Sequence, residues 1–76
     1  MKVVTLALTN EDADNIIKMC KNELHYKIHE SSCCYQYEPE IRALLRILKS
    51  FDIRSYEDYK KEFEERMEEE KANRRW

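Results

Sequence analysis

The chain has 76 residues, of which 39% are charged and 42% are hydrophobic, and its net charge is −2. This balance fits one small helical domain with a charged exterior, excludes a wholly disordered chain, and gives no electrostatic argument for binding a nucleic acid. Glycine is absent, which excludes a P-loop and a dinucleotide-binding turn.

Residues 2–9 (KVVTLALT) alternate with a period of two, which predicts a short strand with Val4, Leu6 and Leu8 on one face. The N–H and C=O groups of a strand need a second strand, and no other segment of this chain resembles one. We therefore expect the strand to pair between protomers of a homo-oligomer, with these three side chains at the contact.

The next segments predict an antiparallel hairpin of two helices. Residues 10–30 carry apolar side chains at helical spacing and follow Thr9 and Asp12, which resemble a capping box. Residues 39–51 begin with a proline, which is favoured in the first turn of a helix, and contain the most apolar run of the chain. The stretch ESSCCYQYE between them breaks the period and predicts a loop.

A third helix is predicted over residues 56–72, where Ser55 and Asp58 resemble a second capping box. Beyond Met67 the sequence has nothing to bury before Trp76, so we expect a frayed C-terminal tail. The predicted fold is mainly α. It is a single domain over residues 1–76, with one short N-terminal strand followed by three helices.

Cysteine and histidine side chains cluster between Cys20 and Cys34. His25 and His29 are four residues apart, a spacing that can place two imidazoles on one metal ion, and Cys33 could add a thiolate from the loop. Adjacent cysteines match a zinc knuckle poorly, and Cys20 falls on the apolar face. We predict no metal site, with His25, His29 and Cys33 as the candidates if a small zinc-stabilised domain is the right alternative.

Catalysis has little support in the sequence. His29 with Cys33 or Cys34 offers a Cys–His pair, but no oxyanion hole or third orienting group is recognisable. We predict neither enzymatic activity nor a cofactor. The short apolar start, followed by acidic residues, does not resemble a secretory signal, and no stretch approaches the roughly 20 apolar residues of a membrane span. With an odd number of cysteines, this predicts free thiols in a reducing cytoplasm.

Tyrosine and arginine side chains predict a binding surface. Aromatic rings with a polar group are favoured at interfaces, and arginine binds phosphate. The predicted partner- or ligand-binding residues are Tyr26, Tyr35, Tyr37, Arg42, Arg46 and Arg54. Two other tyrosines, Tyr56 and Tyr59, are expected to complete the core.

The opening KVVTLALTNEDADNIIKMC, with L-T-x-E-x-A before an amphipathic helix, resembles small phage and prophage accessory proteins, and so does PEIRALLRIL. The resemblance covers about the first fifty residues and transfers no functional residue. It implies a non-enzymatic anti-defence factor that inhibits a host or defence protein by direct binding. The alternative that it implies is a multimeric sponge for a phosphate-bearing nucleotide signal.

Overall fold

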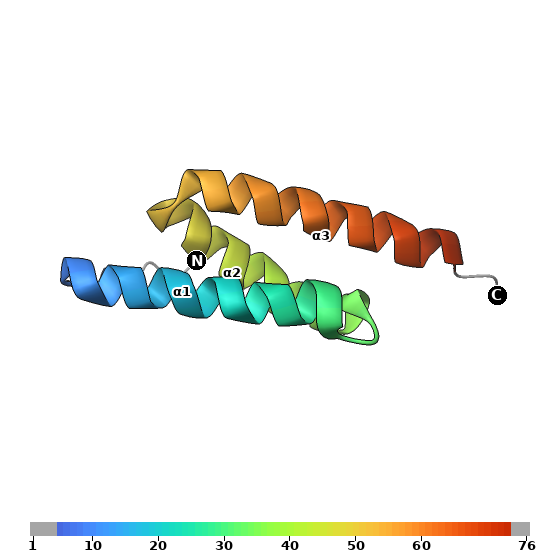
Figure 1. The fold of residues 1–76 in the computed structure, drawn as a ribbon, viewed down its shortest axis with the longest axis horizontal. Helices are drawn as coiled ribbons and strands as arrows, with labels where there is room; N and C mark the ends of the chain where they lie inside the picture. The colour runs from blue at the N-terminus through green and yellow to red at the C-terminus, as the bar shows by residue number, and fades with distance from the viewer. Residues whose placement is uncertain (1–4, 74–76) are drawn as a thin grey trace.

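The computed structural model describes residues 5–73, which form three α-helices (Figure 1). The helices are α1 (Asn10–His25), α2 (Glu38–Phe51) and α3 (Ile53–Asn73). Each helix runs antiparallel to the one before it, and α2 lies between the other two. The predicted mainly α class is confirmed for this part of the chain. None of its helices is both long and apolar enough to cross a membrane.

The strand predicted over residues 2–9 is not found among its described residues, 5–9, which form neither strand nor helix. Leu6 and Leu8 are 68% and 39% exposed, and the rest of the predicted strand, including Val4, lies outside the described residues. A strand requires hydrogen bonds from a second strand, and residues 5–73 of one chain supply none. Pairing between protomers therefore stays a prediction.

α1 begins at the predicted capping box. The Thr9 hydroxyl accepts a hydrogen bond from the Asp12 N–H at 3.0 Å, and the Asp12 carboxylate accepts one from the Thr9 N–H at 3.4 Å. The helix continues past His25 as a π-helical turn, Tyr26–Glu30, which ends where the Ser31 N–H donates to the Tyr26 carbonyl at 2.9 Å. Together α1 and this turn cover the predicted range 10–30.

The connection that was predicted as a loop is partly helical. A 3-10 turn, Cys34–Tyr37, leads directly into α2, which carries Pro39 in its first turn. The apolar face of α2 is buried through Ile41, Leu45 and Leu48.

α3 begins at Ile53 rather than at Tyr56, so the predicted Ser55–Asp58 capping box is wrong. The carboxylate of Asp52 instead accepts the Ser55 N–H at 3.2 Å and the Ser55 hydroxyl at 2.8 Å. These two hydrogen bonds, with a lesser contribution from Lys21 at 3.6 Å, hold the pKa of Asp52 below its usual range. Asp52 can cap α3 because α2 ends immediately before it.

α3 also continues to Asn73, whereas we expected the helix to fray beyond Met67. The Glu70 carboxylate accepts the Cys34 N–H at 2.6 Å, and this contact holds the last turns of α3 against the α1–α2 connection. The remainder of the expected tail, 74–76, lies outside the described residues.

The core is small and lies mainly between α1 and α2. Its buried side chains are Cys20, Leu24, Ile28, Cys34, Ile41, Leu45, Leu48 and Phe63. Tyr56 and Tyr59 pack against it half-buried, as predicted. Of the described part of α3, only Phe63 belongs to this buried set. The molecule is 18 Å across in its shortest direction, which leaves each helix with a wide face outside the core.

Candidate binding groove

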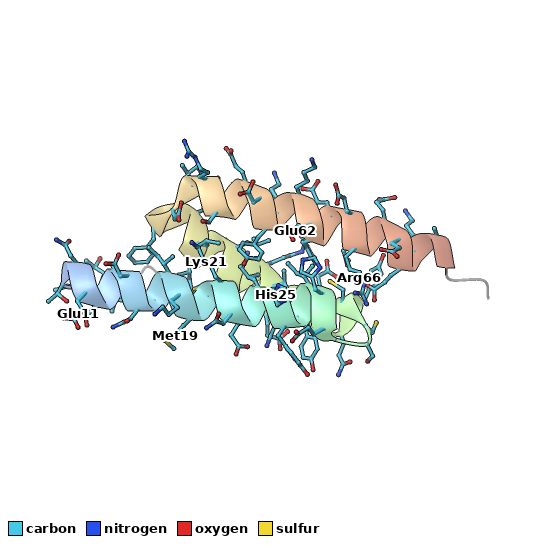
Figure 2. All side chains as sticks on the ribbon, in the orientation of Figure 1. Glu11, Met19, Lys21, His25, Glu62 and Arg66 are labelled. Atoms are coloured by element: carbon cyan, nitrogen blue, oxygen red, sulfur yellow. The ribbon has the colours of Figure 1, made fainter. Side chains whose placement is uncertain are left out.

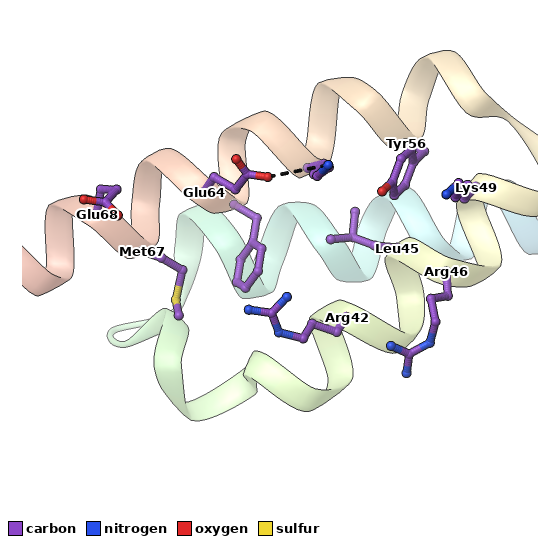
Figure 3. A pocket seen from close by; sticks show the side chains of 10 residues that line it. Arg42, Leu45, Arg46, Lys49, Tyr56, Glu64, Met67 and Glu68 are labelled. Carbon is purple, nitrogen blue, oxygen red and sulfur yellow. Dashed lines mark ion pairs between the residues drawn. The ribbon is translucent and has the colours of Figure 1, made fainter. Parts of the chain in front are cut away.

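A groove of about 530 Å³ lies between α2 and α3 (Figure 3). Its floor is apolar and consists of Leu45, Phe63 and Met67. Its walls are charged, because the solvent-facing sides of both amphipathic helices turn toward it. The charged and aromatic wall residues are Arg42, Arg46, Lys49, Tyr56, Lys60, Glu64 and Glu68, and we call the whole the α2–α3 groove.

Cations lie over aromatic rings along this groove. The Arg42 guanidinium carbon is 5.3 Å from the centre of the Phe63 ring. The ammonium groups of Lys49 and Lys60 lie 5.4 and 5.9 Å from the centre of the Tyr56 ring. A cation over a ring face is attracted by the ring quadrupole, so Tyr56 holds two positive charges at one end of the groove.

The cations of the groove differ in whether a carboxylate of the same chain already pairs with them. The Glu38 carboxylate accepts two hydrogen bonds from Arg42, at 2.9 and 3.0 Å. Lys60 is 3.9 Å from Glu64, a long and exposed pair. Within residues 5–73, the side chains of Arg46 and Lys49 form no ion pair. The groove therefore keeps positive charge that an anionic ligand can use.

The structure brings together only part of the predicted binding residues. Arg42 and Arg46 line the groove, although Arg46 points away from α3 at its outer edge (Figure 3). Arg54 is exposed at the start of α3 and does not line it. We had not predicted Lys49 and Lys60. A signal for Lys60 was available, since Tyr56, Lys60, Glu64 and Glu68 recur every four residues on one helix.

The three predicted tyrosines lie at the end of the hairpin and do not line the groove. The rings of Tyr26 and Tyr37 are 6.5 Å apart, and the Lys27 ammonium lies 4.9 Å from the centre of the Tyr37 ring. The Tyr35 hydroxyl donates to the Met67 carbonyl at 3.5 Å. Tyr35 and Tyr37 are half-buried and join the connection to the rest of the fold, whereas Tyr26 is 47% exposed.

One face of α3 holds the α1–α2 connection through charged side chains (Figure 2). Arg66 donates to the carbonyls of Ile28 at 3.0 Å and Ser31 at 3.2 Å. Glu70 lies 3.7 Å from Arg66 and accepts the Cys34 N–H. We call these five residues the polar clamp. It satisfies carbonyls at the end of the π-helical turn and the N–H at the start of the 3-10 turn, so its role is structural.

The candidate metal ligands do not converge. The rings of His25 and His29 are 5.2 Å apart and tilted by 48°. His29 lies 2.6 Å from a Glu62 oxygen, and His25 lies 3.8 Å from a Glu30 oxygen, so each faces a carboxylate. Across residues 5–73, no group of three or more histidine, cysteine or acidic side chains is placed to hold a metal ion. Cys33 does not join the two histidines in such a group.

Two of the cysteines are unsuited to nucleophilic chemistry. Cys34 is fully buried, and its burial, with the nearby Glu70 carboxylate as a second cause, raises the pKa of its thiol to about 11. Burial also raises the pKa of Cys20. A thiol rather than a thiolate is poorly nucleophilic, so at neutral pH only the half-exposed Cys33 remains as a candidate.

Alkylation should reflect this difference. We expect iodoacetamide at pH 8 to modify Cys33 rapidly in the folded protein, while Cys20 and Cys34 react only after unfolding in urea. Intact-mass spectra over time would then show one early adduct and three in denaturant. A Cys33→Ser variant is the control, since it should show no early adduct. Equal rates for all three thiols in the native protein would contradict the assignment.

No protein family model, curated protein or solved structure matches this chain.

Proposed function

We propose that this protein is a non-enzymatic binding protein, and that its α2–α3 groove takes an acidic helical segment of a partner protein. One observation carries the proposal: four cationic side chains and two aromatic rings line a single groove with an apolar floor, whereas its two carboxylates, Glu64 and Glu68, lie on the α3 wall alone. The cations are Arg42, Arg46, Lys49 and Lys60, and the rings are Tyr56 and Phe63.

The form of the groove supports a protein segment as the ligand. Two antiparallel helices with an apolar floor between them are suited to an amphipathic helix, which lays its apolar face into the groove. Tyrosine and arginine are also enriched among the residues that dominate binding energy at protein interfaces. A partner helix with carboxylates beside its apolar face would pair with the cations of both walls. The resemblance to phage accessory proteins suggests a host or defence protein as that partner.

A second candidate is a phosphate-bearing small molecule such as a nucleotide. It is favoured by the ammonium groups of Lys49 and Lys60, which lie 5.4 and 5.9 Å from the centre of the Tyr56 ring. The two lysines can contact phosphate while the aromatic ring contacts a base. Arg42 contributes less here because Glu38 already binds its guanidinium.

Calorimetric titration with two probes tests the proposal. The first probe is a helical peptide that carries glutamates on one face beside leucines, and the second is ATP. We expect the peptide to bind, and Lys49→Glu and Lys60→Glu to weaken it about tenfold each through charge repulsion. Arg54→Glu is the matched control, because it makes the same charge change on an exposed residue outside the groove.

The outcomes separate the candidates. ATP binding that the two lysine variants abolish, with no binding of the peptide, would favour the small-molecule alternative. The proposal fails if neither probe binds, or if Arg54→Glu weakens the peptide as much as the lysine variants do.

A further inference from the structure

The α3 wall of the groove carries opposite charges in two separate halves. Tyr56, Lys60, Glu64 and Glu68 recur every four residues and so form one row along the helix. At one end of the row, the ammonium groups of Lys60 and of Lys49 from α2 lie 5.9 and 5.4 Å from the centre of the Tyr56 ring. At the other end lie the carboxylates of Glu64 and Glu68 (Figure 3).

These charges are poorly compensated within one chain. Lys49 and Glu68 form no ion pair within residues 5–73, and the Lys60–Glu64 pair is 3.9 Å long with both side chains more than half exposed. Exposed pairs of this kind contribute little to stability. The row can therefore pair with a ligand whose positive and negative charges follow one another in the reverse order along its length.

We propose that a second copy of this chain covers the groove, with the two α3 helices antiparallel about a two-fold axis. An antiparallel pair reverses the order of charges, so the acidic half of each copy meets the cationic half of the other. If Glu64 of one copy lies opposite Lys60 of the other, Glu68 falls level with Tyr56, over which the Lys49 ammonium lies. The two-fold axis repeats both contacts, as in any interface that uses the same patch on both subunits.

The inference rests on the proposed function, because both place the carboxylates of a helix against the cations of the α2–α3 groove. The dimer then regulates the site: the second copy must leave before a partner protein can enter. This contact differs from strand pairing through Val4, Leu6 and Leu8, since it needs only α2 and α3.

A charge-swap experiment tests the dimer. The first variant, Lys49→Glu with Lys60→Glu, makes the α3 row acidic, and the second, Glu64→Lys with Glu68→Lys, makes it basic. All four side chains are exposed, so both variants should keep the helical circular dichroism of the parent. Sedimentation velocity should show a concentration-dependent dimer for the parent that weakens as salt rises.

We expect each variant alone to dimerise at least about tenfold more weakly, because every cross-contact becomes repulsive. Mixing the two variants should restore a dimer, since all four cross-contacts in the heterodimer are attractive. Arg54→Glu with Lys18→Glu is the control, with the same charge change on exposed residues outside the groove, and should dimerise like the parent.

The inference would be overturned by a parent that stays monomeric at about 0.1 mM, by variants that dimerise like the parent, or by a mixture of the two variants that stays monomeric. A dimer lost in Leu6→Asp but kept in both charge variants would also overturn it and favour strand pairing. A monomeric parent that binds the acidic peptide would overturn the dimer alone. A charge-swappable dimer whose separated chains bind neither peptide nor ATP would overturn the proposed function alone.

Discussion

An Arg66→Ala variant should lose about 2–3 kcal/mol of its free energy of unfolding, because the guanidinium is the donor to two backbone carbonyls. These are the carbonyls of Ile28 and Ser31, and the same side chain lies beside the Glu70 carboxylate. Without the guanidinium, the two carbonyls and the Glu70 carboxylate would lose this partner at a part-buried site. A chain of this size has on the order of 5–10 kcal/mol in total, so the loss is a large share.

Urea denaturation followed by circular dichroism, at one fixed protein concentration, measures this effect. Arg46→Ala is the matched control, since Arg46 is exposed and should cost less than about 0.5 kcal/mol. The cost of combining Arg66→Ala with Glu70→Gln should fall short of the sum of the single costs, because the two residues share one network. If Arg66→Ala were no more costly than Arg46→Ala, the polar clamp would not hold α3 in place.

Leu48→Ala should lower the free energy of unfolding by about 3 kcal/mol, within the range of 2–5 found for buried leucines. Leu48 is 0% exposed and belongs to the core between the helices. Its truncation removes buried apolar surface and leaves a cavity that the surrounding helices can fill only partly.

The neighbouring Ile47 offers a control of similar chemistry. It is 42% exposed, so Ile47→Ala should cost less than about 1 kcal/mol in the same urea experiment. A thermal scan should place the midpoint for Leu48→Ala more than about 10 °C below that of Ile47→Ala. Equal losses for the two variants would mean that the face of α2 toward the core is wrongly assigned.

The sequence by itself determined the helices and the apolar faces of the first two. Helical periodicity depends on neighbours three and four residues apart, and these lie on one face whatever the rest of the chain does. The same holds for the capping box of Thr9 and Asp12, whose hydrogen bonds span three residues. Local patterns of this kind need no tertiary contact to be read.

The start of α3 shows where a local pattern misleads. Ser55 and Asp58 have the spacing of a capping box, which predicted a helix start at Tyr56. In the structure the Asp52 carboxylate caps α3 instead. It also lies 3.6 Å from the ammonium group of Lys21 in α1. The contact between Lys21 and Asp52 joins segments far apart in the chain, so the spacing of residues within α3 could not predict it.

Only the tertiary structure decided the binding groove and the polar clamp. The groove forms because α2 and α3 pack side by side, which brings Lys49 next to Tyr56 and Lys60. The clamp joins Arg66 to Ile28 and Ser31, which are 38 and 35 residues away in the chain. Which helix faces meet depends on the connections and on the shared core, and neither leaves a periodic signal in the sequence. The predicted tyrosines consequently lie at the end of the hairpin, whereas Arg42 and Arg46 line the groove and Arg54 lies at the start of α3.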